Sequence, residues 1–193
     1  FFRIFCTSMS SCATSPLTHL PIVMGHRGAL YAEPENTLES FACCARMGAE
    51  SVEFDIWTSK DGQLVVFHGE KGPDGVEGML SGMMDCLHLE GKHPGGQIYI
   101  EELTWAQLRE LRFREDLKWK LPCGPEQAMT STGIPLLQDV LELCKNTGMR
   151  PTCELKGLDT AHATVRLLEE LHMVDNATIS SLYHQLLVQA QQQ

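Results

Sequence analysis

The sequence predicts an α/β fold built on a parallel sheet, because strand and helix patterns alternate along its length. Residues 51–57 alternate apolar and polar side chains, which is typical of a β-strand. A short apolar run at 21–24 and a helical pattern at 38–47 precede this strand. A strand–helix–strand unit favours parallel pairing, since the helix returns the chain to the same end of the sheet.

The first predicted strand covers residues 21–24 and ends in a polar turn. His26 and Arg27 come directly after the apolar run, so the strand presents both side chains at its carboxyl end. Gly25 and Gly28 flank them and let the backbone turn sharply. Both side chains are therefore candidates for a site at this end of the sheet.

The helical pattern at 38–47 has signals at both of its ends. Asn36, followed three residues later by Glu39, predicts a capping box at the N-terminus, and Gly48 predicts the C-cap. Apolar side chains recur with helical spacing and predict the buried face of this helix. That face consists of Leu38, Phe41, Ala42 and Ala45.

The strand at 51–57 carries two acids where a buried face is expected. Side chains two apart share a face, so Glu53 and Asp55 point the same way, roughly 7 Å apart along the strand. A turn and a β-rich run at 64–67 then bring His68 beside them. Two inward carboxylates cost too much desolvation to be idle, so the pattern predicts a metal and acid–base site.

Residues 70–125 interrupt the alternation with glycine-rich stretches. This length exceeds that of a routine connection, so we expect an insertion lying over the site. It contains Met79, Met83 and Met84, for which packing is favoured over a lid or a lipid-contacting patch.

The alternation resumes after the insertion. A helical pattern at 135–144 places four residues on one face, namely Leu137, Val140, Leu141 and Cys144. It leads into a predicted strand at 151–156. Within this strand Glu154 and Lys156 share one face, so the pattern of the earlier acidic strand is repeated in short form. The remaining predicted elements are a helix at 159–171, a strand at 177–181 and a helical start at 183–193.

Composition and charge limit the class of protein. The chain has 193 residues, of which 43% are hydrophobic and 21% charged, as expected for one soluble globular domain. The net charge of -10 and pI of about 5.2 argue against a general nucleic-acid binder and against an anionic membrane surface as partner. No apolar run approaches the ~18 residues that a transmembrane span requires.

The N-terminus and the cysteines suggest a location. Residues 1–20 are rich in Ser and Thr and lack acids, which favours a flexible N-terminal tail over a remnant of a targeting segment. The eight cysteines form no C-x-x-C pair and no zinc spacing, so we expect them to be reduced and mostly buried. A cytoplasmic location is therefore favoured over a secreted disulfide framework.

Strand periodicity turns a set of polar residues inward or places them at strand ends. This set is His26, Arg27, Glu53, Asp55, His68, Glu154 and Lys156. Three carboxylates suit a hard divalent cation such as Mg²⁺ or Ca²⁺, and two histidines suit proton transfer near neutral pH. An arginine and a lysine suit anionic oxygens. Together the residues indicate hydrolysis or transfer at a phosphate ester.

Each of these residues has a simpler explanation when taken alone. Glu154 and Lys156 could form an ordinary ion pair, His26 could be a core histidine, and Arg27 could be a surface charge. The two acids of the 51–57 strand could lie on a solvated edge. These explanations would be independent accidents, whereas one site accounts for all seven residues.

Five motifs occur in a characteristic order. They are His26-Arg27-Gly28, Pro34-Glu35-Asn36-Thr37, Glu53-Phe54-Asp55 with Thr58-Ser59-Lys60-Asp61-Gly62, His68, and Glu154-Leu155-Lys156. In order and spacing they resemble the glycerophosphodiester phosphodiesterase family, although no single motif would suffice. The resemblance covers residues 21–181, which is nearly all of the chain.

The resemblance implies a TIM-type (β/α) barrel with an insertion after the second strand. It also implies metal-dependent hydrolysis of glycerophosphodiesters, such as glycerophosphocholine, to glycerol 3-phosphate and an alcohol. By the family pattern, His26 and His68 would form the acid–base pair. Glu53, Asp55 and Glu154 would hold Mg²⁺ or Ca²⁺, and Arg27 and Lys156 would bind the substrate phosphate.

The sequence departs from the family pattern in two respects. Gly69 stands where the family usually has Asp, which could change the orientation or the basicity of His68. A (β/α)₈ barrel typically takes about 250 residues, so we expect residues 21–193 to form a barrel domain that lacks its C-terminal strands.

Two other functions are compatible with these residues. Lysophospholipase D-like action on lysophospholipids would be favoured if the methionine-bearing segment 79–84 were exposed and hydrophobic. A non-catalytic phosphate- or lipid-binding remnant would bind ligand or metal without turnover. The sequence leaves the head group, the metal and the oligomeric state open.

Overall fold

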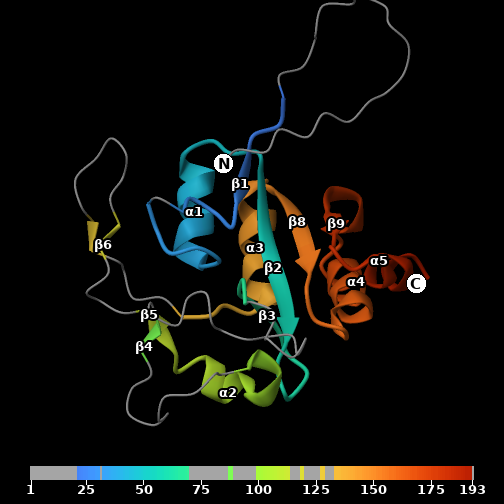
Figure 1. Ribbon diagram of the computed structural model, residues 1–193. Helices are drawn as coiled ribbons and strands as arrows, with labels where there is room; N and C mark the ends of the chain where they lie inside the picture. The colour runs from blue at the N-terminus through green and yellow to red at the C-terminus, as the bar shows by residue number, and fades with distance from the viewer. Residues whose placement is uncertain are drawn as a thin grey trace, which may run out of the picture.

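The computed structural model describes residues 21–30, 32–69, 87–88, 99–113, 118–119, 127–128 and 133–192. Its central sheet has β1 (Met24–His26), β2 (Ser51–Thr58), β8 (Arg150–Leu155) and β9 (Thr178–Ser180) in that order, all paired in parallel (Figure 1). The predicted parallel α/β sheet is thereby confirmed. The predicted tail at 1–20 and the methionines at 79–84 lie outside the described residues.

The far end of β2 turns back as a hairpin. β3 (Leu64–Val66) pairs with it antiparallel, and Ile56 lies opposite Val66. Ser59 supports the turn, because its hydroxyl accepts from the Gln63 N–H at 2.9 Å. This antiparallel strand is the exception to the parallel order, as the short predicted turn requires.

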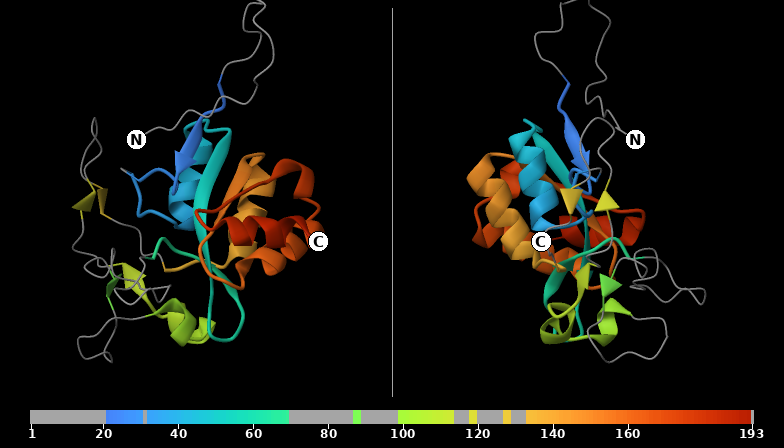
Figure 2. Two further views of the ribbon diagram at one scale, coloured as in Figure 1. Left: turned by 45° about the vertical axis from the view of Figure 1, so that its right-hand side comes forward. Right: turned by 90° about the vertical axis from the view of Figure 1, so that its left-hand side faces the viewer.

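Helices cover one face of the sheet. They are α1 (Leu38–Arg46), α3 (Leu137–Thr147), α4 (Thr160–Glu170) and α5 (His184–Gln191). Helices α1 and α3 lie side by side, as the two views of Figure 2 show. No helix in the described ranges is long and apolar enough to cross a bilayer.

The short elements lie mostly in the inserted part of the chain. They are β4 (Leu87–His88), the 3₁₀ helix η2 (Ile100–Glu102), α2 (Trp105–Leu108), β5 (Arg112–Phe113), β6 (Lys118–Trp119), β7 (Gln127–Ala128) and, near the end of the chain, the 3₁₀ helix η3 (Val174–Asn176). β4 pairs with β5 and β6 pairs with β7, both antiparallel.

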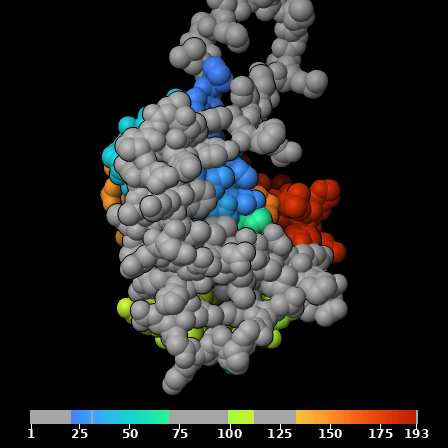
Figure 3. All heavy atoms as spheres, turned by 60° about the vertical axis from the view of Figure 1, so that its left-hand side comes forward, coloured from blue at the N-terminus to red at the C-terminus, as the bar shows by residue number. Residues whose placement is uncertain are grey.

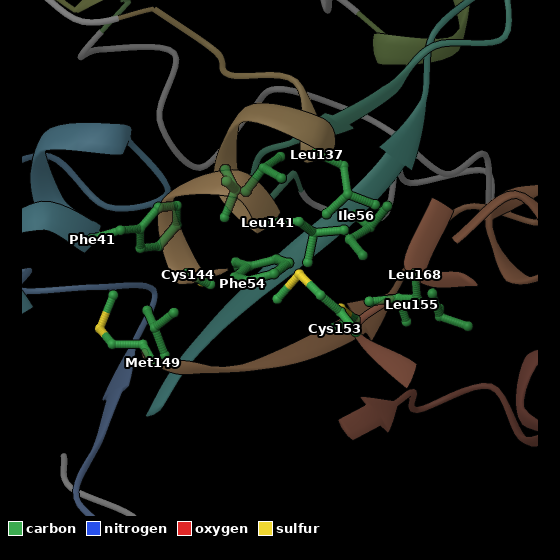
Figure 4. Packing of buried hydrophobic residues seen from close by; sticks show 14 of the residues in the cluster. Phe41, Phe54, Ile56, Leu137, Leu141, Cys144, Met149, Cys153, Leu155 and Leu168 are labelled. Atoms are coloured by element: carbon green, nitrogen blue, oxygen red, sulfur yellow. The ribbon is translucent and has the colours of Figure 1, made fainter. Parts of the chain in front are cut away.

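The main core lies between the sheet and these helices. Phe54 and Ile56 of β2 face Phe41 of α1 and Leu141 of α3 (Figure 4). The predicted buried face of the second helix is confirmed, because Leu137, Val140, Leu141 and Cys144 are all fully buried. The four cysteines that the structure describes, Cys43, Cys44, Cys144 and Cys153, are free.

A second, smaller cluster lies under the hairpin. Trp57 and Phe67 pack there with Ile100, Leu108 and Leu111, which belong to the described part of the insertion. The two faces of β2 therefore differ, since the residues at 52, 54 and 56 join the main core while those at 53, 55 and 57 do not. The period-two prediction for this strand is confirmed.

The predicted capping box of α1 is wrong. Thr37 is the N-cap, and its hydroxyl accepts from the Ser40 N–H at 3.2 Å. Asn36 adopts a left-handed backbone (φ 58°), and its side chain binds a residue of β2 instead. At the other end Met47 is the C-cap, and Gly48 follows it at φ 81°. A tertiary contact has taken Asn36 away from the local role that its sequence position suggests.

Candidate active site

Parallel pairing in register brings the predicted acids together. His26 of β1 lies beside Glu53 of β2, and Asp55 of β2 lies beside Glu154 of β8. Glu53, Asp55 and Glu154 each offer an oxygen atom, and these atoms all lie within 4.8 Å of one another. Strands far apart in the sequence therefore build one acidic cluster, as the spacing predicts.

Lys156 comes one residue after β8 and reaches back to this cluster. Its Nζ lies 2.6 Å from Glu154 Oε1 and 3.2 Å from Asp55 Oδ1. Its backbone N–H donates to the carbonyl of Ile56 at 3.1 Å, which ties the residue to the end of β2. The lysine is therefore held by two carboxylates rather than by the single ion pair considered from the sequence.

Arg27 contacts three acids from the turn after β1. Its backbone N–H donates to Glu53 Oε2 at 3.1 Å, and its Nε lies 3.4 Å from Asp55 Oδ2. Its Nη1 lies 3.3 Å from Glu35 Oε2. The turn requires glycine at position 28 (φ 90°), because an added Cβ would lie 2.8 Å from Ser40 Cβ in α1.

His26 is the most open of these residues. Half of its side chain is exposed, and its Nε2 lies 3.7 Å from Glu53 Oε2. Burial of the rest of the ring, with the neighbouring Arg27 charge, lowers the pKa of His26. On the face drawn in Figure 3 the blue N-terminal segment, the green end of the β2–β3 region and the orange and red C-terminal parts meet.

Two residues of this site, Glu35 and Asn36, did not emerge as site residues from the sequence reasoning. Glu35 is buried beside Arg27, and Asn36 Nδ2 donates to Asp55 Oδ2 at 3.0 Å. Both belong to the Pro34–Thr37 motif, in which the sequence pattern predicts only a helix cap at Asn36. Spacing alone does not reveal the contact of Asn36, because its partner Asp55 lies 19 residues away.

The family model for the glycerophosphoryl diester phosphodiesterase family matches residues 26–187, which include all seven predicted site residues. The chain belongs to this family. Among curated glycerophosphodiester phosphodiesterases, one from Bacillus subtilis is 38% identical over 124 residues (63% of this chain, 35% of that protein). One from Caldanaerobacter subterraneus is 24% identical over 172 residues (84% of this chain, 58% of that protein).

Solved structures of the phosphodiesterase family agree with this assignment. An Oleispira antarctica phosphodiesterase, solved with the product sn-glycerol-3-phosphate, has a TM-score of 0.65 and 28% identity. The match covers 88% of this chain and 60% of that one. The TIM-type fold expected from the sequence is confirmed, and the chain spans less than two thirds of the length of these relatives.

The pKa values of the three clustered carboxyl groups are shifted from their ordinary values. Burial, with the charges of Asp55 and Glu154, raises the pKa of Glu53 to about 8. Burial also raises the pKa of Asp55, although Lys156 and Arg27 oppose the shift. Burial acts in the same direction on Glu154, but there the hydrogen bond and charge of Lys156 prevail and the pKa is lowered. The positive charges of Arg27 and Lys156 are therefore too few to stabilise the ionised form of all three carboxyl groups.

This imbalance fits a divalent cation. Four carboxylates (Glu35, Glu53, Asp55 and Glu154) face two cations (Arg27 and Lys156), which leaves two uncompensated negative charges if all are ionised. Glu53 Oε1 is buried and accepts no hydrogen bond from any residue that the structure describes. All the donor atoms are carboxylate oxygens, which hard cations prefer.

His68, the second histidine of the family pattern, follows β3. The adjacent Phe67 N–H donates to the carbonyl of Asp55 at 3.0 Å, so the backbone at His68 lies at the same end of β2 as the acids. The indole N–H of Trp57 donates to the carbonyl of His68 at 3.1 Å. The fold thus brings the main chain of His68 to the site.

Proposed function

We propose that this protein hydrolyses glycerophosphodiesters to sn-glycerol 3-phosphate and an alcohol, with a bound divalent cation. The observation that carries the proposal is the cluster of three carboxylates within 4.8 Å, flanked by Lys156 and Arg27. The names of the relatives support it, and so does the product bound to the Oleispira antarctica phosphodiesterase. Its substrate is a small molecule.

In this proposal Glu53, Asp55 and Glu154 hold Mg²⁺ or Ca²⁺. The cation would supply positive charge to the phosphate oxygens of the substrate. These carboxylates project from two neighbouring strands, and Asn36 orients the one of Asp55 by a hydrogen bond. A rigid sheet therefore sets the spacing of the ligand atoms before a substrate arrives.

Arg27 and Lys156 bind the phosphate in this proposal. The guanidinium of Arg27 lies between Glu35 and Asp55, which orient its planar donors. Lys156 is held by two carboxylates, so its charge stays at the cluster whether or not a substrate is bound. Both cations can hold anionic oxygens without a large rearrangement of the chain.

His26 and His68 carry the protons in this proposal. One imidazole removes a proton from the attacking oxygen, and the other gives a proton to the leaving alcohol oxygen. His26 is half exposed and sits against Glu53, so it can meet a substrate held at the cluster. Each histidine acts directly on the reacting oxygens, so loss of either should slow the chemical step.

We further propose that residues 21–193 form one barrel-type domain with an insertion at about 70–125. The described part of the insertion packs on the β2–β3 hairpin through Ile100 and Leu108. The lysophospholipid alternative depended on residues 79–84, which lie outside the described ranges. Glycerophosphodiesters are therefore the first substrates to test.

The test measures release of sn-glycerol 3-phosphate from glycerophosphocholine with Mg²⁺, with Ca²⁺ and with EDTA. We expect metal-dependent release that falls at least ~100-fold in His26→Ala and in His68→Ala. His162→Ala is the matched control, because His162 is exposed on α4 and lies outside the five motifs. Metal binding without turnover would instead indicate a binding protein, and equal release in EDTA would remove the cation from the mechanism.

A further inference from the structure

Trp57 continues the site face of β2. It lies two residues beyond Asp55, on the face that carries both acids, and only 3% of it is exposed. Packing alone accounts for its burial, because it joins the cluster under the hairpin. Its polar atom, however, makes a specific contact, since Nε1 donates to the carbonyl of His68 at 3.1 Å.

The indole also lies against the residue after His68. Gly69 has a left-handed backbone (φ 55°), and an added Cβ would lie 2.9 Å from Trp57 Nε1 and 3.1 Å from Cε2. Real Cβ atoms essentially never approach a neighbour this closely, so a side chain at position 69 would displace the ring. The ring occupies the space in which such a side chain would stand.

The opposite edge of the indole faces the segment after β8. An added Cβ at Gly157 would lie 3.4 Å from Trp57 Cε3 and 3.3 Å from a methyl carbon of Thr160. Gly157 comes directly after Lys156, and the N–H groups of both residues point to the carbonyl of Ile56. One rigid ring therefore separates the segment that carries His68 from the segment that carries Lys156.

We propose that Trp57 is a positioning residue that sets the placement of His68 relative to Lys156, with Gly69 as its steric partner. The catalytic part rests on the proposed phosphodiesterase function. The close contact between Trp57 and Gly69 also explains why glycine follows His68, at a position where the family usually has Asp. Here the indole N–H and ring edge hold the backbone of the histidine.

Two substitutions separate the hydrogen bond from the packing. Trp57→Phe keeps an aromatic ring but removes the N–H, so the carbonyl of His68 loses the hydrogen bond from the indole. Gly69→Ala keeps the N–H but pushes the indole away and strains the backbone. Because misplacement by about 1 Å can cost up to 10²-fold in rate, we expect each to lower kcat about tenfold or more. KM and Mg²⁺ affinity should stay within about twofold, since the acidic cluster is intact.

Trp105→Phe is the matched control. Trp105 packs against the same cluster as Trp57, but its polar contacts are made by its backbone. Its N–H donates to Asp61 Oδ1 at 2.8 Å, and its carbonyl accepts from the Arg109 N–H at 2.9 Å. Trp105→Phe therefore makes the same Trp-to-Phe change in the same cluster, but without removing a hydrogen bond to His68. It should leave kcat unchanged within about twofold.

The decisive readout is spectroscopic and needs no turnover. Histidine rings are labelled with ¹³C in the full chain, and the signals of His68 are assigned with His68→Gln. We expect the His68 signals to shift in Trp57→Phe and in Gly69→Ala, with those of His162 and His172 unchanged. Unchanged His68 signals together with unchanged kcat in Trp57→Phe would overturn the proposal.

This design separates the two proposals. If the wild-type chain releases no sn-glycerol 3-phosphate, the proposed function fails while the His68 signals still decide the role of Trp57. If the variants unfold, the contact is tested in the wild-type protein by measuring hydrogen exchange of the Trp57 indole N–H. Slow exchange is expected for a buried, hydrogen-bonded N–H, and exchange as fast as that of an exposed indole would contradict the contact.

Discussion

Asn36 and Asp55 hold each other by two hydrogen bonds. Asn36 Nδ2 donates to Asp55 Oδ2 at 3.0 Å, and the Asp55 backbone N–H donates to Asn36 Oδ1 at 3.3 Å. The backbone N–H of Asn36 donates in turn to the carbonyl of Arg27 at 3.0 Å. The left-handed backbone of Asn36 permits this arrangement, which connects the loop after β1 to the acid at the centre of the cluster.

Replacing this asparagine should therefore weaken both the fold and the site. Asn36→Ala leaves the buried Asp55 N–H without its side-chain acceptor and removes the amide donor from Asp55 Oδ2, which should cost about 1–3 kcal/mol of unfolding free energy. Urea unfolding measures this loss. Asn176→Ala is the control, because the Asn176 side chain makes an exposed bond to Arg150 and should change stability by less than about 0.5 kcal/mol. Equal losses in the two variants would contradict the assigned importance of the pair.

Glu53→Gln should weaken cation binding without unfolding the protein. The amide keeps the shape of the carboxylate but not its charge, and Glu53 Oε1 is a buried oxygen without a hydrogen-bond partner among the described residues. We expect a loss of at least about tenfold in Mg²⁺ affinity, measured by calorimetry. Glu169→Gln, an exposed change on α4, should leave the affinity unchanged. Retained affinity in Glu53→Gln would remove this residue from the ligand set.

The metal-free protein should become less stable as the pH rises. The raised pKa of Glu53, about 8 against an ordinary value of 4.5, means that between these pH values the folded state holds a proton that the unfolded chain has lost. The contribution of this shift to the unfolding free energy is fully present below about pH 4.5 and is lost as the pH approaches 8. The unfolding free energy falls by at most about 1.4 kcal/mol per pH unit in this range. The unfolding free energy of wild type relative to Glu53→Gln, measured in EDTA at pH 5, 6.5 and 8, should fall accordingly. Excess Mg²⁺ should reduce the fall, because a bound cation favours the carboxylate, and a difference that stays constant with pH would contradict the shift.

The close approach of Gly28 to α1 predicts an unequal pair of glycine substitutions. Gly28 and Gly148 both have left-handed backbones (φ 90° and 77°), so Ala at either position costs about 1–2 kcal/mol in backbone strain. A Cβ at 148 meets nothing within 4 Å, whereas one at 28 collides with Ser40. Gly28→Ala should therefore lose at least about 1 kcal/mol more than Gly148→Ala in urea unfolding. Equal losses would show that α1 moves aside without cost.

The structure agrees with the sequence periodicity in β2 and α3. In α1 the agreement is partial, because Phe41 of the predicted face is buried but the other buried residues are Ser40 and Cys44. The alternation along β2 predicts which of its residues face the helices, because successive side chains on a strand must point to opposite faces. The helical spacing of Leu137, Val140, Leu141 and Cys144 predicts a buried stripe, and all four are buried. These patterns depend only on backbone geometry, so they can be found without knowledge of the neighbours.

The acidic cluster could be predicted in part for a related reason. Glu53, Asp55 and Glu154 lie on strands whose parallel pairing follows from the strand–helix–strand order, so their meeting is a consequence of topology. The contacts of Glu35 and Asn36 could not be predicted in this way. Their partners, Arg27 and Asp55, lie 8 and 19 residues away, and only the folded loop brings them together.

The sequence by itself determined the faces of β2, the buried stripe of α3 and the set of polar residues at the strand ends, because each follows from the repeat of the backbone. Only the tertiary structure decided that Thr37 rather than Asn36 caps α1, since the buried Asp55 competes for the asparagine side chain. The same holds for Trp57, whose sequence position predicts a face but not the contact with His68. Hydrogen bonds and steric contacts between distant segments exist only once the sheet has formed, so no local pattern encodes them.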